Sequence, residues 1–161
     1  FMGCGKSSVG RSLSKLLCCP FMDLDTVIEE SQGRSIPDIF AAEGEAAFRQ
    51  MEVEALSRII EAQQLRGNVV VALGGGAVMT PECAELVSKK THCIYLRASV
   101  DTLVSHLENE AAGRPMLQGA SLRSRIEELM ALRSSTYEAT AHDVIDTDSK
   151  TVEEVAAEIK F

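Results

Sequence analysis

The sequence predicts an α/β fold, in which helices cover a parallel β-sheet, and three observations support this prediction. Short apolar runs alternate along the chain with longer stretches of helical periodicity. Residues 69–73 (VVVAL) form a continuous apolar run, as expected of a strand that is buried on both faces. A glycine-rich turn ending in Gly5-Lys6-Ser7 leads directly into a helical pattern. The 161 residues suffice for one core, so we expect a single domain over 1–161.

Two helices and two strands are expected in the first half of the chain. A helix is predicted over 7–17, followed by a short strand over 20–23 that ends in acidic residues. Apolar residues at helical spacing within 44–66 predict a helix with one face toward the core. The strand over 69–73 then stops at three consecutive glycines.

The second half continues the alternation. A helix begins near Pro81, and a second buried strand follows over 93–96. Ser99 is expected to cap a helix that ends at 107. Between 108 and 120 the periodicity fails, and the glycines and the proline there predict a mobile loop. The remaining elements are a helix over 121–139, a strand over 144–145 and a closing helix with Val152, Val155, Ala156 and Ile159 on its apolar face.

The composition argues against two classes of partner. The chain carries 24 acidic against 16 basic side chains, a net charge of -8, which opposes non-specific binding to nucleic acid. Its apolar runs are much shorter than the roughly 20 residues of a membrane-spanning helix. The five cysteines form neither a metal-binding pattern nor the framework of a small secreted domain. We therefore expect a cytoplasmic protein that binds neither nucleic acid nor membrane.

Residues 1–8 fit the second half of a phosphate-binding P-loop, G-x-x-x-x-G-K-[ST], whose first glycine would lie one residue before Phe1. In this motif backbone amides and a helix N-terminus hold phosphates, the lysine adds a positive charge and the hydroxyl binds magnesium. A strand should launch such a loop, so we expect a buried strand upstream of Phe1. The alternative is a glycine-rich turn that merely precedes a helix.

Asp23 and Asp25 follow the first predicted strand and, by alternation, point the same way. In a phosphoryl-transfer site one such acid can hold the water shell of a metal ion while the other accepts a hydroxyl proton. The alternative is an acidic strand end that caps the next helix.

Arg49 and Glu52 share a helix face, because they lie three residues apart. The carboxylate could hold the guanidinium in place, or the two could form a solvated surface pair. The glycines at 74–76 come directly after a buried strand, where ligands of open α/β sheets collect, and they would let a ligand touch backbone.

These segments, in this order, resemble the shikimate kinase family over nearly the whole chain. The resemblance is carried by the GKS turn, FMDLD, IEESQGRSIPDIF, GEAAFRQME, VVALGGGAV, RPML, LMALRSSTY and DVIDT. It implies a nucleoside-monophosphate-kinase-like, three-layer α/β/α P-loop fold with a central parallel five-stranded sheet whose first strand is missing from this sequence. It also implies a substrate-binding region at about 25–55 and a lid at about 108–120. The family phosphorylates the 3-hydroxyl of shikimate from ATP with Mg²⁺, in the pathway to chorismate and the aromatic amino acids.

The resemblance also implies roles for particular residues. Lys6, Asp25 and Arg114 would be catalytic, with Asp25 taking the hydroxyl proton and Arg114 reaching the transferred phosphoryl group from the lid. Mg²⁺ would be held by Ser7 directly and by Asp23 through water. Shikimate would be bound by Asp25, Arg49, Gly75, Gly76 and Arg133. ATP would be bound by Gly3, Cys4, Gly5, Lys6, Ser7, Ser8 and Arg114. We expect a monomer whose partners are shikimate and ATP.

One departure from the family pattern concerns the nucleotide. Family members commonly place an arginine ahead of the lid to stack on adenine, and this chain has His106-Leu107 there. Two alternative functions stay open. One is another small-metabolite P-loop kinase, such as a gluconate kinase, and the other is a catalytically silent kinase-like protein with a regulatory role.

Overall fold

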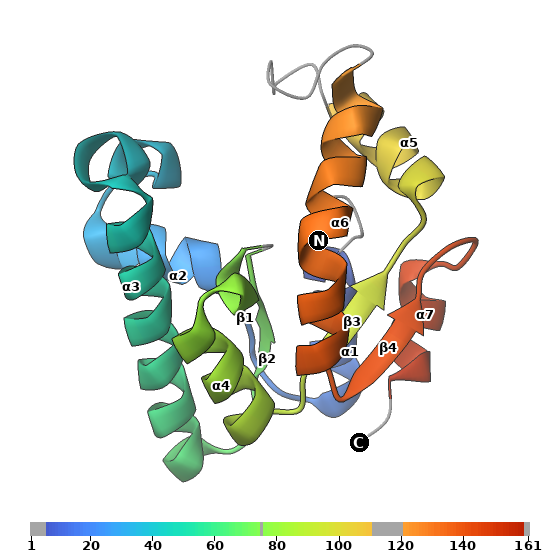
Figure 1. Cartoon of the computed structure of the whole chain (residues 1–161). Helices are drawn as coiled ribbons and strands as arrows, with labels where there is room; N and C mark the ends of the chain where they lie inside the picture. The colour runs from blue at the N-terminus through green and yellow to red at the C-terminus, as the bar shows by residue number, and fades with distance from the viewer. Residues whose placement is uncertain (1–5, 75, 111–120, 160–161) are drawn as a thin grey trace.

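A computed structural model of the chain describes residues 6–74, 76–110 and 121–159. Helices, singly or in consecutive pairs, alternate with short strands in this part of the chain (Figure 1). The elements are α1 (Lys6–Leu17), β1 (Phe21–Asp23), α2 (Leu24–Gln32), α3 (Ile36–Arg66), β2 (Val70–Ala72), a 3₁₀ turn η1 (Ala77–Met79), α4 (Pro81–Lys90), β3 (Ile94–Arg97), α5 (Val100–Glu110), α6 (Ser121–Thr140), β4 (Asp143–Asp146) and α7 (Val152–Glu158).

The described strands pair in parallel, as the sequence predicts. Phe21 of β1 lies opposite Val70 of β2, and Ile94 of β3 lies opposite Asp143 of β4. The α/β class is therefore confirmed. The described residues hold two two-stranded sheets rather than the five-stranded sheet expected, and within them no ladder joins β2 to β3.

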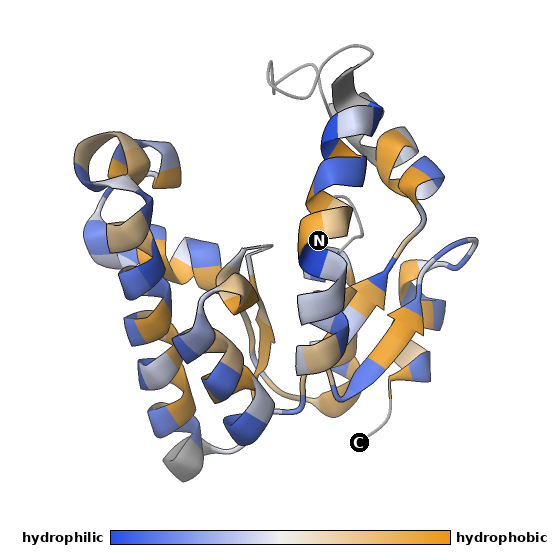
Figure 2. Cartoon of the chain, in the orientation of Figure 1, coloured by the Kyte–Doolittle hydropathy of each residue, from blue (hydrophilic) through white to orange (hydrophobic). Residues whose placement is uncertain are grey.

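Helices cover the strands with their apolar faces (Figure 2). Helix α1 packs against α7 and against β1 and β2, while α4 packs against α3 and α6. In Figure 1, α4 and α6 lie in front of the strands and α1 lies behind them. The core side chains come from nearly every element and include Val9, Leu24, Ile39, Leu103, Ile126 and Val155. None of the described helices is both long enough and apolar enough to cross a bilayer.

The boundaries of the helices follow their capping residues. The Ser99 hydroxyl accepts a hydrogen bond from the Thr102 amide at 3.2 Å, which confirms Ser99 as a cap. Helix α5 then continues to Glu110, three residues beyond the predicted end. Helix α3 starts earlier than predicted, at Ile36, and is interrupted at Gly44, whose φ of 86° and ψ of 174° are not helical. Glycine adopts this positive φ without the steric cost that a Cβ would impose.

Strand β2 differs from the prediction in its burial. Its composition is that of a strand buried on both faces, but Val69, Val70 and Val71 are each half-buried. The next two residues of the run, Ala72 and Leu73, are half-buried as well. The prediction of full burial is therefore wrong for this strand, because one of its edges borders a cavity.

Candidate active site

Most of the predicted site residues that the structure describes meet where β1 and β2 end. Asp23 is the last residue of β1, and Gly74 follows the end of β2 by two residues. Helix α1 begins beside them at Lys6. The carboxyl ends of neighbouring parallel strands lie at one edge of the sheet, which is the usual location of ligands in α/β proteins.

Lys6 joins the start of α1 to the end of β2. Its Nζ donates a hydrogen bond to the Leu73 carbonyl oxygen at 2.6 Å. The first turn of α1 carries no acidic side chain. An ammonium group and a helix N-terminus without a neighbouring carboxylate on the first turn favour binding of an anion here.

Asp23 uses both of its carboxylate oxygens. Oδ1 accepts hydrogen bonds from the amides of Asp25 at 3.0 Å and Thr26 at 3.4 Å, which makes Asp23 the N-cap of α2. Oδ2 accepts a hydrogen bond from the Ser7 hydroxyl at 3.1 Å. The capping alternative from the sequence is therefore confirmed, and the second oxygen still faces Ser7. A hydroxyl and a carboxylate are hard oxygen ligands that suit Mg²⁺.

Asp25 lies in the first turn of α2, where several charged side chains influence its carboxyl. Burial raises its pKa above the ordinary value, and the negative charge of Asp23 raises it further. The charge of Lys6 acts in the opposite direction, as does that of Arg49 at a smaller magnitude. A carboxylate with a raised pKa is a better proton acceptor, which is what a general base requires.

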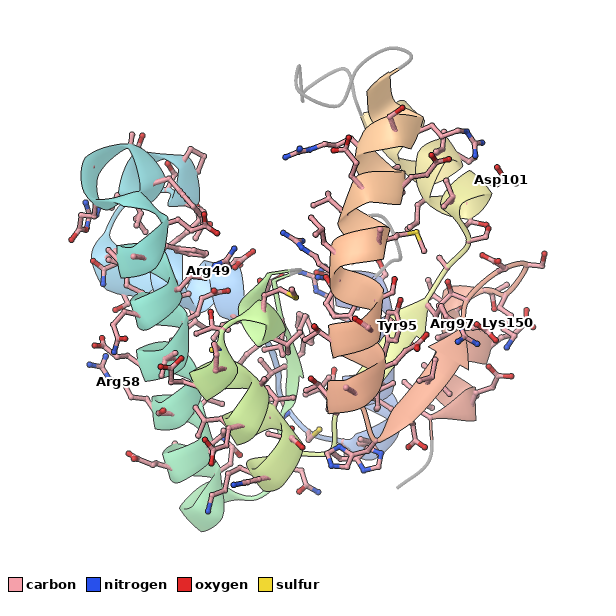
Figure 3. The ribbon with its side chains drawn as sticks, viewed as in Figure 1. Arg49, Arg58, Tyr95, Arg97, Asp101 and Lys150 are labelled. Atoms are coloured by element: carbon pink, nitrogen blue, oxygen red, sulfur yellow. The ribbon has the colours of Figure 1, made fainter. Side chains whose placement is uncertain are left out.

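Arg49 is held by carboxylates of its own helix. Its Nη1 donates to Glu52 Oε1 at 2.6 Å, and its Nη2 donates to Glu45 Oε1 at 3.3 Å. Figure 3 shows Arg49 projecting from α3 toward the ends of β1 and β2, whereas Arg58 on the same helix points away. The surface-pair alternative is wrong, because the Glu52 side chain is 0% exposed.

Glu52 itself is an unusual buried charge. Burial raises its pKa, and the hydrogen bond from Arg49 opposes that rise. Its second oxygen, Oε2, is buried and has no hydrogen-bond partner among the described residues. The positive charge of Arg133, on α6, also lowers the pKa of Glu52, so α6 contributes a charge to the same cluster.

The glycines after β2 leave room around these charged groups. A Cβ at Gly74 would lie 3.1 Å from Asp25 Oδ1 and 3.4 Å from Glu52 Oε2. A Cβ at Gly76 would overlap the guanidinium of Arg49. The glycines therefore allow the backbone after β2 to approach the carboxylates and the arginine closely.

Some predicted site residues fall outside the part of the chain that the structure describes. These are Gly3, Cys4, Gly5, Gly75, Arg114 and the predicted lid from residue 111 onward. Ser8 is described and is exposed in the first turn of α1.

Two site features were not predicted from the sequence. One is the burial of Glu52, for which an Arg-x-x-Glu spacing gives no signal, since the same spacing suits a solvated pair. The other is the Leu73 carbonyl that binds Lys6, because a backbone acceptor has no side-chain signature.

Comparison with known proteins gives a consistent family. A family model described as shikimate kinase matches residues 2–160. The shikimate kinase of Thermus thermophilus is 40% identical over 159 residues, covering 99% of this chain and 84% of its own length. That of Dictyoglomus turgidum is 37% identical over 161 residues, covering 99% and 91%.

Solved structures show the same likeness. A shikimate kinase from Acinetobacter baumannii, solved in complex with shikimate, superposes with a TM-score of 0.86 at 32% identity. The superposition covers 98% of this chain and 85% of that one. A shikimate kinase from Bacteroides thetaiotaomicron superposes with a TM-score of 0.85 at 28% identity, covering 98% and 90%.

Proposed function

The chain belongs to the shikimate kinase family, and from this premise we propose that it transfers the γ-phosphoryl group of ATP to the 3-hydroxyl of shikimate. The product is shikimate 3-phosphate, an intermediate of chorismate and aromatic amino-acid biosynthesis. One observation supports the assignment most directly: the Asp25 carboxyl lies close enough to two positive charges for both to lower its pKa. One is Lys6, on the phosphate side, and the other is Arg49, on the acceptor side.

The acceptor binds between α3, the turn after β2 and α6. Arg49 and Arg133 bind the shikimate carboxylate, because a planar guanidinium fits a carboxylate with two parallel hydrogen bonds. Gly75 and Gly76 contribute backbone contacts. Glu52 keeps the Arg49 guanidinium oriented through the 2.6 Å hydrogen bond, so less freedom is lost when the ligand binds.

Asp25 acts as the general base. Its carboxylate accepts the proton of the 3-hydroxyl as the hydroxyl oxygen forms a bond to the γ-phosphorus, and the bond from that phosphorus to ADP breaks. The raised pKa of Asp25 favours this transfer, because a more basic carboxylate holds the proton better. Such a base contributes about 10²- to 10⁴-fold to the rate.

The phosphates bind at the start of α1. Gly3, Cys4 and Gly5 supply backbone amides, Ser8 lies in the first helical turn, and Lys6 leaves the Leu73 carbonyl to reach the β- and γ-phosphates. Ser7 would hold Mg²⁺ and Asp23 would support it through water, since the Ser7 hydroxyl and Asp23 Oδ2 lie 3.1 Å apart and both are oxygen ligands that suit this ion. When bound, the ion neutralises developing negative charge on the phosphates.

Arg114 completes the site from the lid at about 108–120 by stabilising charge on the transferred group, a contribution of about 10³- to 10⁵-fold in analogous reactions. Closure of the lid excludes water. The protein works as a single-domain monomer in the cytoplasm.

The test is coupled ADP release with ATP and Mg²⁺ in the presence of shikimate, of gluconate or of no acceptor. Release that requires shikimate supports the proposal. Release with gluconate alone assigns a different acceptor, and shikimate binding without any release identifies a silent kinase-like protein. Mass spectrometry of the product checks that the phosphoryl group is on shikimate.

A further inference from the structure

The carboxylate of Asp25 accepts no hydrogen bond from any of the described residues. It lies against the turn after β2, where a Cβ at Gly74 would come within 3.1 Å of Asp25 Oδ1. A side chain without a hydrogen-bond partner is oriented by its own backbone and by the packing around it. The direction of this carboxylate therefore depends on how the backbone of Asp25 is held.

The backbone of Asp25 is held by the side chain of Asp23. Oδ1 of Asp23 accepts hydrogen bonds from the Asp25 amide at 3.0 Å and from the Thr26 amide at 3.4 Å. These two amides belong to the second and third residues of α2, which are the positions that an N-cap side chain satisfies. The hydrogen bond from the Asp25 amide is thus a direct link between the cap and the residue that we propose as the base.

Asp23 is itself fixed on two sides. It is the last residue of β1 and lies opposite Ala72 of β2, and α2 begins at the very next residue. Its φ of -102° and ψ of 121° are those of extended backbone. Its other carboxylate oxygen, Oδ2, accepts the hydrogen bond from the Ser7 hydroxyl at 3.1 Å. The sheet therefore holds Asp23, and Asp23 holds the start of α2.

The apolar contacts of α2 act on another part of this helix. Leu24 and Ile28 are 0% and 2% exposed and attach one face of α2 to the core, since they lie four residues apart. Asp25 lies roughly 100° around the helix axis from Leu24. Helix α2 has only nine residues, a length at which a helix depends on such outside contacts. The core contacts fix one face of α2, and the cap fixes the first turn that carries Asp25.

We propose that Asp23 is a positioning residue for Asp25: through Oδ1 it holds the Asp25 backbone and thereby orients the Asp25 carboxylate toward the acceptor hydroxyl. This role is separate from the support of Mg²⁺, which falls to the other oxygen, Oδ2. One carboxylate thus connects the nucleotide side of the site with the acceptor side. The inference rests on the proposed function, because it takes Asp25 as the base that contacts shikimate.

The test separates the two oxygens of Asp23 by substitution. Asp23→Asn keeps an oxygen that can cap α2, because asparagine caps helices as well as aspartate does, whereas Asp23→Ala loses the cap. Ser7→Ala removes only the partner of Oδ2. Thr151→Ala is the matched control for a lost cap elsewhere, since the Thr151 hydroxyl caps α7 by accepting the Glu154 amide at 3.1 Å.

Shikimate is titrated against each protein with EDTA and without nucleotide, so that metal binding does not contribute. Asp23→Ala should raise the Kd for shikimate about tenfold, the value of one charged hydrogen bond lost with the displaced carboxylate. Asp23→Asn, Ser7→Ala and Thr151→Ala should leave this Kd almost unchanged. Asp23→Ala and Thr151→Ala should both lower Tm by about 3 °C, so a loss of stability alone does not explain the difference.

Two further measurements identify the cause. Amide hydrogen exchange of Asp25 and Thr26, measured without any ligand, should be faster in Asp23→Ala than in Asp23→Asn. With ATP and Mg²⁺, the kcat of Asp23→Ala should fall about a hundredfold below that of Asp23→Asn, because a base displaced by about 1 Å reacts far more slowly. If Asp23→Ala does not fold, Asp23→Gly replaces it, since glycine lacks the acceptor but costs little stability at an N-cap.

Unchanged shikimate affinity in Asp23→Ala would overturn the proposal. An equal loss of affinity in Asp23→Asn would overturn it too, because the charge and not the cap would then be responsible. An equal loss in Thr151→Ala would assign the effect to stability. If the unaltered protein neither binds shikimate nor releases ADP with it, the proposed function fails instead. The ligand-free exchange at Asp25 then decides the positioning role, and equal rates in Asp23→Ala and Asp23→Asn would refute it.

Discussion

Two ion pairs of equal length lie beside different strand pairs, one near β1 and β2 and the other on β3 and β4. Arg49 donates to Glu52 at 2.6 Å beside the ends of β1 and β2, and Arg97 donates to Asp146 at 2.6 Å across β3 and β4. The Glu52 side chain is 0% exposed, whereas the Asp146 side chain is 59% exposed. Burial raises the pKa of Glu52 despite its arginine, while the hydrogen bond from Arg97 lowers the pKa of Asp146.

The difference shows that two ion pairs of equal length can accompany pKa shifts of opposite direction in their carboxylates. An exposed pair is solvated and contributes little to stability. A buried pair costs desolvation free energy, because its charges are removed from water. Proteins often retain such buried charges at sites where they act on a ligand. Asp25, Glu52 and Arg49 place partly or fully buried charges at the β1–β2 end, where we propose that the acceptor binds, whereas the β3–β4 pair belongs to a solvated surface.

The largest effect is expected when the base is removed. Asp25→Asn should lower turnover of shikimate by about 10²- to 10⁴-fold, because the hydroxyl proton loses its acceptor. ATP binding should change little, since Asn keeps the shape of the side chain. Steady-state kinetics and ATP titration measure both quantities, with Asp146→Asn as the exposed control. Turnover near that of the unaltered protein would remove Asp25 from the mechanism.

The next effect concerns stability. Arg49→Ala leaves the buried Glu52 carboxylate without its partner and should lower the free energy of unfolding by about 3 kcal/mol. Arg97→Ala, at the exposed pair, should leave urea unfolding almost unchanged. The double variant Arg49→Ala/Glu52→Gln should recover much of the loss, because the stranded charge is gone. A double variant no more stable than Arg49→Ala would show that the cost is not electrostatic.

A smaller effect separates charge from geometry. Arg49→Lys keeps the positive charge but loses the planar fork, so the KM for shikimate should rise about tenfold, the value of one charged hydrogen bond. The KM for ATP should rise less. Arg58→Lys is the matched control on the solvent side of α3. Equal increases for both substrates would argue against a carboxylate clamp.

The smallest effect is the pH dependence of stability. The pKa of Asp25 is raised above 3.8 in the folded state, so its protonated form favours folding, and this contribution is lost as pH rises through the folded pKa. Asp25→Asn should therefore raise Tm at neutral pH, with the gain disappearing below pH 3.8. Asp146 has a lowered pKa, so Asp146→Asn should lower Tm at neutral pH instead. The same sign for both variants would contradict the contrast.

The strands and helices were largely predictable, because apolar periodicity reports burial directly. The β-branched run before Gly74 predicted β2, and Ser99 predicted the start of α5. The predicted helix starts at Gly44, where the structure has its interruption, so the sequence did not reveal the helical segment that begins at Ile36 and precedes this glycine. Nor could it predict that β2 is half-buried. An apolar, β-branched run indicates that a strand is buried, but it does not show whether a cavity borders that strand.

The candidate site was predictable as a set of residues but not as an electrostatic arrangement. Motif order placed Lys6, Ser7, Asp23 and Asp25 together. The burial of Glu52 and the dual use of the Asp23 oxygens depend on how α2 and α3 pack against the strands, which no local pattern encodes.

Chemical-shift mapping with shikimate tests the contrast between the two ends most directly. Titration of ¹⁵N-labelled protein should shift the amides of Asp25, Arg49, Gly74 and Gly76 and leave those of Arg97 and Asp146 unchanged. Shifts concentrated at the β3–β4 end, or shifts spread evenly over both ends, would contradict the assignment of the buried charges to the acceptor site.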